Sequence, residues 1–208
     1  MKYIPIGLVL VFALSFCNLS EKFKHGKSSS GSESGSSSSS SGGGSAEKGV
    51  ATPAQAAAIA GGKDARWDRQ GMSWTVPATW KETENESKQF MWSAPSSSAN
   101  LIVSISPMDE SFPAESSIQA FYDQAKSRAK NGEVDEVKWV EIDGLKGVQF
   151  REANPEKPDD SRRLQWMAYR KFTGQLQLVN LMLASNGKDF PAQQDAMYGI
   201  LYSMKITH

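Results

Sequence analysis

Apolar and polar residues alternate along most of the segment 137–184, and this two-residue period is typical of half-buried β-strands. The alternation breaks at Asp143-Gly144 and again at Thr173-Gly174. Glycine accepts the positive φ that a tight hairpin turn requires, so both pairs predict hairpins. The pattern therefore predicts the middle of an antiparallel sheet. Its predicted strands are 137–142, 145–153, 163–172 and 176–184.

The rest of the domain predicts further strands and two helices. In 116–130, apolar side chains recur at the spacing of one helix face, and Asn131-Gly132 supplies a left-handed stop. A second amphipathic helix is predicted at 191–202. The predicted strands upstream are 65–69, 72–76, 90–92 and 100–106.

The segment 176–184 differs from the other predicted strands because it is apolar on both faces. Leu178 and Met182 point to one face of the sheet, and Val179 and Leu181 point to the other. A strand of this kind needs cover on both faces. We therefore expect an α+β domain in which an antiparallel sheet of about six to seven strands has helices packed on both faces, as an α/β/α sandwich.

Residues 1–16 have the form of an export signal, with a positive start and an apolar run too short to span a bilayer as a helix. The run ends in Leu-Ser-Phe-Cys, which resembles the lipobox of bacterial lipoproteins. This resemblance implies that Cys17 is lipidated and anchors the protein to a membrane. The lipobox has a small residue where this chain has Phe16. The alternative is cleavage after Ser15, which would release a soluble protein.

Residues 17–63 are predicted to be a Ser/Gly/Ala-rich flexible tether. The segment 28–45 is almost wholly Ser and Gly, so no apolar burial offsets the entropy of ordering it. Thr52-Pro53 opens a short Ala-rich stretch that predicts a marginal helix at the domain's edge. The folded domain is placed at 64–208, which carries nearly all the aromatic residues and is long enough for one core.

The amino-acid composition limits the kinds of partner and active site that this protein can have. The 208 residues carry no net formal charge, and no basic stripe indicates a nucleic-acid partner. Cys17 is the only cysteine, and the two histidines are His25 and the terminal His208. The domain interior therefore lacks Cys/His zinc sites and His- or Cys-based nucleophiles. We expect no cofactor, no metal and no catalytic residue; the alternative is an envelope hydrolase built on carboxylates or a Ser/Lys pair.

Three groups of side chains suggest binding roles, and each also has a structural interpretation. The tryptophans near strand ends are either partner anchors or, as we favour, core and edge residues: Trp67, Trp80 and Trp92. Basic residues of one strand form either a phosphate or carboxylate site, or a charged edge paired with Asp159 and Asp160: Arg162, Arg163, Arg170 and Lys171. Alternating glutamates either bind a cation such as Ca²⁺ or lie on a solvated hairpin: Glu82, Glu84 and Glu86.

Three short motifs, in order, resemble PsbP-like domains. Residues 71–77 read Gly-Met-Ser-Trp-Thr-Val-Pro with Trp80 following, 142–147 read Ile-Asp-Gly-Leu-Lys-Gly, and the closing helix at 200–205 carries Ile-Leu-x-Ser-x-Lys. The resemblance covers about 70–206, and the branch to which the chain is similar is that of bacterial exported lipoproteins of the DcrB and LpqN kind. It implies an antiparallel sheet between helices and a binding or assembly role without shared catalytic residues.

Together these features predict a binding or assembly-factor domain that is exported and held at the cell envelope, on the periplasmic face or the cell surface. The anchor is the lipid on Cys17. The expected partner is an envelope protein or a small ligand, and not nucleic acid.

Overall fold

The structure, a computed structural model, describes residues 45–207 of the chain. Its α-helices are α1 (Pro53–Ala58), α2 (Ala114–Lys130) and α3 (Phe190–Tyr202). Its strands are β1 (Glu47–Lys48), β2 (Lys63–Trp67), β3 (Met72–Val76), β4 (Lys81–Asn85), β5 (Gln89–Ser93), β6 (Ala99–Met108), β7 (Val134–Ile142), β8 (Leu145–Glu152), β9 (Ser161–Phe172), β10 (Gln175–Asn186) and β11 (Lys205–Ile206).

The strands of the described residues form a large sheet and a small one. The large sheet has eight strands in the order β1-β7-β8-β9-β10-β6-β5-β4, and the small sheet has the order β11-β3-β2. All neighbours are antiparallel except β1, which pairs with β7 in parallel. The predicted antiparallel α+β architecture is confirmed, with more strands than expected. The extra strands are two residues long or, in β4, wholly polar, so they carry no apolar alternation.

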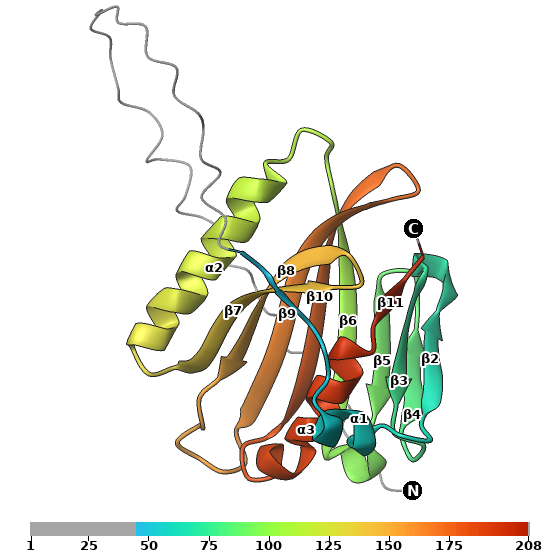
Figure 1. Ribbon diagram of the computed structural model, residues 1–208, viewed down its shortest axis with the longest axis vertical. Helices are drawn as coiled ribbons and strands as arrows, with labels where there is room; N and C mark the ends of the chain where they lie inside the picture. Colours follow the sequence, from blue (N-terminus) through green and yellow to red (C-terminus); the bar gives the residue numbers. More distant parts are fainter. Residues whose placement is uncertain (1–44, 208) are drawn as a thin grey trace, which may run out of the picture. The chain divides into compact units, whose positions relative to one another are not determined.

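Helices pack on both faces of the large sheet, as strand β10 predicted. On one face, α2 covers β7 and β8, and its Ala125 shares a cluster with Phe150 and Leu178. On the other face, α3 packs against β10 and β3, and its Ile200 shares the main core with Val179. Figure 1 shows α2 beside β7 and α3 next to the small sheet. The alternating side chains of β10 therefore enter two separate clusters.

The folded unit begins earlier than residue 64, so the predicted C-terminal boundary of the tether is corrected. Strand β1 pairs with Val140 and Glu141 of β7. Helix α1 starts at a capping box formed by Thr52 and Gln55, and it packs against α3. A Cβ at Gly199 would lie 2.4 Å from the Gln55 backbone oxygen, so the helices touch at backbone distance. This close packing stabilises a helix that would be marginal alone.

The predicted signal peptide 1–16, the lipidation site Cys17 and the tether as far as residue 44 lie outside the described residues. Among residues 45–207, no helix has both the length and the apolar composition needed to cross a bilayer.

Candidate binding site

The candidate site lies where strands β8 and β9 separate. Their register ends at Val148 opposite Met167, yet β8 continues back to Leu145 and β9 continues to Phe172. The space between them is a pocket of about 610 Å³ that strand β11 closes on a third side. Its walls are formed by Leu145, Tyr169, Arg170, Lys171, Phe172 and Ile206, among others. A pocket of this volume suits a small ligand.

The two predicted hairpin turns frame this pocket. Asp143 and Gly144 have φ values of 47° and 83°, and Thr173 and Gly174 have φ values of 48° and 82°. The Asp143 carboxylate accepts hydrogen bonds from the backbone N–H of Ile206 at 2.7 Å and from the Lys205 Nζ at 3.3 Å. The β7–β8 turn is thereby fastened to the C-terminal strand, which holds this wall of the pocket in place.

Arg170 is the charged group at the centre of the site. Alternation along β9 turns its side chain toward the face that packs on the small sheet, and it is 7% exposed. Its Nη2 donates to the backbone oxygen of Gln70 at 2.7 Å and to the Gln70 Oε1 at 3.2 Å. Its Nε donates to the Gln177 Oε1 at 3.4 Å. All three acceptors are neutral oxygens.

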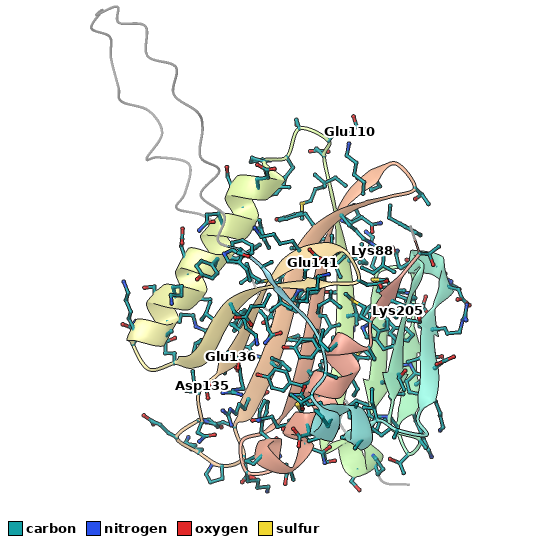
Figure 2. All side chains as sticks on the ribbon, viewed as in Figure 1. Lys88, Glu110, Asp135, Glu136, Glu141 and Lys205 are labelled. Atoms are coloured by element: carbon teal, nitrogen blue, oxygen red, sulfur yellow. The ribbon has the colours of Figure 1, made fainter. Side chains whose placement is uncertain are left out.

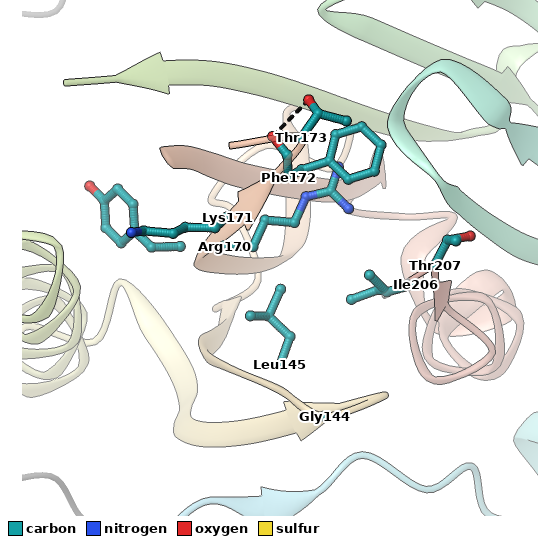
Figure 3. Close-up of a pocket in the computed structure, with 9 residues that line it drawn as sticks. Gly144, Leu145, Arg170, Lys171, Phe172, Thr173, Ile206 and Thr207 are labelled. Carbon is teal, nitrogen blue, oxygen red and sulfur yellow. Dashed lines mark hydrogen bonds between the residues drawn. The ribbon is translucent and has the colours of Figure 1, made fainter. Parts of the chain in front are cut away.

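The guanidinium of Arg170 lacks an opposite charge. Among residues 45–207, no carboxylate forms an ion pair with it, and its buried Nη1 has no hydrogen-bond partner. Burial without compensation lowers the pKa of Arg170 to about 10. Figure 3 shows the guanidinium beside the Phe172 ring, with Leu145 and Ile206 on other sides of the pocket. The site therefore holds a desolvated cation next to apolar walls.

The other basic residues of β9 do not join this site. Strand β9 is fourth of eight in the large sheet, so the predicted charged edge is wrong. Arg162 and Arg163 lie at the opposite end of this 12-residue strand from Arg170 and Lys171, so the four residues form no common anion site. The pairing with Asp159 and Asp160 is also wrong: Arg162 pairs with Asp135, and Arg163 pairs with Glu152.

A network of paired charges surrounds Arg162 and Arg163. Burial alone would raise the pKa of Glu152, but hydrogen bonds from Arg163 and Arg128 outweigh it and hold this pKa below its usual value. Asp135 accepts from Arg151 and Arg162, each at 2.7 Å.

Glu136 belongs to the same network and lies next to Asp135 on β7 (Figure 2). It accepts from the Tyr198 hydroxyl of α3 at 3.0 Å and from the Gln149 Nε2 at 2.6 Å. Burial and the neighbouring Glu136 raise the pKa of Tyr198. The carboxylates of this network are held by cations or donors, an arrangement that joins α3 to the sheet.

The tryptophans and glutamates weighed from the sequence have structural roles. Trp67, Trp80 and Trp92 are all buried in the main core, which confirms the packing interpretation. The glutamates Glu82, Glu84 and Glu86 lie on or beside the exposed strand β4. Within the described part of the chain, no group of acidic or histidine side chains is arranged to hold a metal ion.

Sequence reasoning named Arg170 but not the residues that make it a site. Gln70 lies 100 positions away along the chain, and Ile206 enters from the last strand. One local signal was available. Arg170 follows Trp166 and Ala168 at the two-residue strand period, which predicts an inward position for a charged side chain.

No protein-family model matches the sequence, and the comparison with curated proteins found no match. Solved structures do resemble it. LpqN of Mycobacterium tuberculosis, described as involved in cell envelope biogenesis, is 13% identical with a TM-score of 0.50, covering 66% of this chain and 83% of its own. The PsbP of the cyanobacterium Synechocystis sp. PCC 6803 is 12% identical with a TM-score of 0.46, covering 70% and 92%. The Ran-binding protein Mog1p of Saccharomyces cerevisiae is 12% identical with a TM-score of 0.38, covering 70% and 95%.

The likeness to LpqN establishes the fold. It agrees with the fold that the PsbP-like resemblance of the sequence predicted. At this identity the likeness extends to architecture and not to residues of a site.

Proposed function

We propose that this protein is a non-catalytic binding or assembly-factor domain of the cell envelope. The observation that carries the proposal is the pocket between β8 and β9, in which the buried Arg170 cation has an unpaired donor among the described residues. A desolvated cation without a counter-ion is costly to keep. A ligand or partner that supplies the missing negative charge would offset that cost.

The envelope location rests on the sequence and on one neighbour. Residues 1–16 act as the export signal, Cys17 carries the lipid anchor, and the Ser/Gly-rich residues up to 44 act as the tether that sets the domain's reach. LpqN, whose fold this domain shares, is described as involved in cell envelope biogenesis. The partner is an envelope protein or a small ligand presented near the membrane.

The charge network argues for binding rather than hydrolysis. A carboxylate that acts as a general acid or base must be able to exchange its proton with substrate. Asp135, Glu136 and Glu152 are instead occupied by arginine, tyrosine and glutamine donors. Their pairing argues against a carboxylate-based hydrolase site at these three residues.

Photo-cross-linking in cells tests the proposal. One photoreactive residue is placed at the exposed Lys171 on the pocket rim, and a matched one at the exposed Lys188, beyond the opposite end of β10. We expect a defined adduct from position 171 that is absent from position 188. Equal labelling from both positions, or no adduct together with a hydrolase activity lost on replacing Glu152, would show that the binding proposal is wrong.

A further inference from the structure

The pocket has one buried cationic donor, Arg170, and the other polar side chains of its lining include the exposed Lys171, Thr173 and Thr207. Two of the three guanidinium nitrogens of Arg170 already donate to Gln70 and Gln177, which leaves Nη1. The N–H groups of Nη1 can donate charge-assisted hydrogen bonds to a carboxylate. A phosphate dianion needs more donors than a single Nη1 supplies. The free donor therefore suits a monoanion.

Three large apolar side chains contribute to the pocket lining. Leu145, Phe172 and Ile206 line the pocket with half-buried side chains. Lys171 stands exposed at the rim, where its ammonium can attract an anion without reaching the interior. A ligand that fills the pocket must therefore place hydrocarbon against these side chains and its charge at one end.

The Phe172 ring packs on the guanidinium that carries the free donor. The ring lies over the guanidinium, with Arg170 Cζ 4.5 Å from the ring centroid, and Nη1 is covered rather than open to solvent. Phe172 is the last residue of β9 before the exposed turn Thr173-Gly174. A ring at a strand end can rotate aside without breaking the sheet. An entering carboxylate would take the place of the ring edge at Nη1.

We infer that the pocket binds an organic carboxylate with an adjoining apolar group, held by the Arg170 guanidinium. This inference rests on the proposed binding function and names its ligand class. The same chemistry is found in a free aliphatic acid and in the C-terminus of a polypeptide that ends in an apolar residue. Both sources present one carboxylate next to hydrocarbon.

Titration calorimetry on the full-length chain tests the ligand class. The probes are octanoate and a short peptide that ends in leucine with a free C-terminus, each compared with its neutral amide, and inorganic phosphate. We expect at least one acid to bind about tenfold or more tightly than its amide, because a charge-assisted hydrogen bond is lost in the amide. Octanoate preference indicates a small acid, and peptide preference indicates a chain terminus.

Variants assign the effect to Arg170. R170M is expected to weaken acid binding about tenfold or more, whereas R66M, the same change at an exposed arginine, leaves it within about twofold. The acid–amide comparison uses the unaltered chain, so it tests the inference even if R170M fails to fold. Equal binding of acids and amides, preference for phosphate, unchanged binding by R170M, or no binding of any probe would each overturn the inference. An adduct specific to position 171 would still support the proposed binding function in those cases.

Discussion

The ring of Phe172 lies over the guanidinium of Arg170, with the Cζ atom 4.5 Å from the ring centroid. The two residues are two positions apart on β9, so their side chains share one face of the strand. The contact supplies a cation–π attraction, but it also removes water from the charge. A buried arginine is usually paired with a carboxylate, and an unpaired buried position is usually apolar. The protein instead keeps a covered cation at a pocket wall.

Replacing Arg170 should change stability little at neutral pH. The reduction of its pKa from the usual 12.5 to about 10 corresponds to a burial cost of roughly 3 kcal/mol. R170M removes that cost but leaves three acceptor atoms on Gln70 and Gln177 without their donor, at about 1 kcal/mol each. We expect the two effects to offset one another, so that the free energy of unfolding at pH 7 stays within about 1–2 kcal/mol of wild type in urea titrations.

The free energies of unfolding of wild type and R170M should diverge at high pH. Between about pH 10 and 12.5, the folded state releases the Arg170 proton while the unfolded state retains it, so stability contributed by this group rises with pH. Between pH 9 and pH 11, the free energy of unfolding of wild type should rise by about 1 kcal/mol relative to that of R170M. A difference that is constant over this range would contradict the burial of an uncompensated charge.

Gly147 is expected to be intolerant of a side chain. A Cβ there would lie 2.5 Å from the Met167 backbone oxygen and 2.6 Å from the Trp166 Nε1. G147A should lower the free energy of unfolding by about 2–3 kcal/mol, because a packed core does not accommodate the added volume. The matched control is G174A, which has open space but a positive φ and should cost only about 1 kcal/mol. Equal losses for the two variants would argue against the close packing of β8 and β9.

Glu152 should make the domain acid-sensitive. Its lowered pKa means that its ion pairs stabilise the folded state above the unfolded value of about 4.5, and this contribution is lost as the pH falls further. E152Q should cost about 1–3 kcal/mol at pH 7, and the loss relative to wild type should shrink below pH 4. The control is E110Q, at an exposed position. A loss independent of pH would indicate a packing effect instead.

Cys17 should carry the lipid in cells. Intact-mass spectrometry of protein extracted from membranes should show a mature N-terminus at acylated Cys17. The C17S variant should leave the membrane fraction. A soluble species beginning at Phe16 would refute lipidation while leaving export intact.

The local features of the fold were predictable because their causes are local. The Asp143-Gly144 and Thr173-Gly174 turns depend on the φ freedom of their own residues. The apolar stripe of α2 is visible within a single segment. The two-sided apolar character of β10 also predicted helices on both faces.

The features that the sequence analysis missed or assigned wrongly depend on contacts with other segments of the chain. Strand β1 is two residues long and is ordered by pairing with β7, so nothing in its own composition marks it. The assignment of β9 to an edge failed because β9 pairs with β8 on one side and with β10 on the other. The pocket was not predictable, since the contact between Arg170 and Gln70 joins residues 100 positions apart.

The central claim is that the Arg170 guanidinium receives the charge of the ligand. It is tested most directly by NMR of the arginine side-chain nitrogens of the full-length chain during titration with octanoate and with the leucine-terminated peptide. We expect the Arg170 Nη signals to shift and to exchange more slowly with water at saturation by the acid that binds, while the signals of exposed Arg66 stay unchanged. Saturation by that acid with no change in the Arg170 signals would contradict the account.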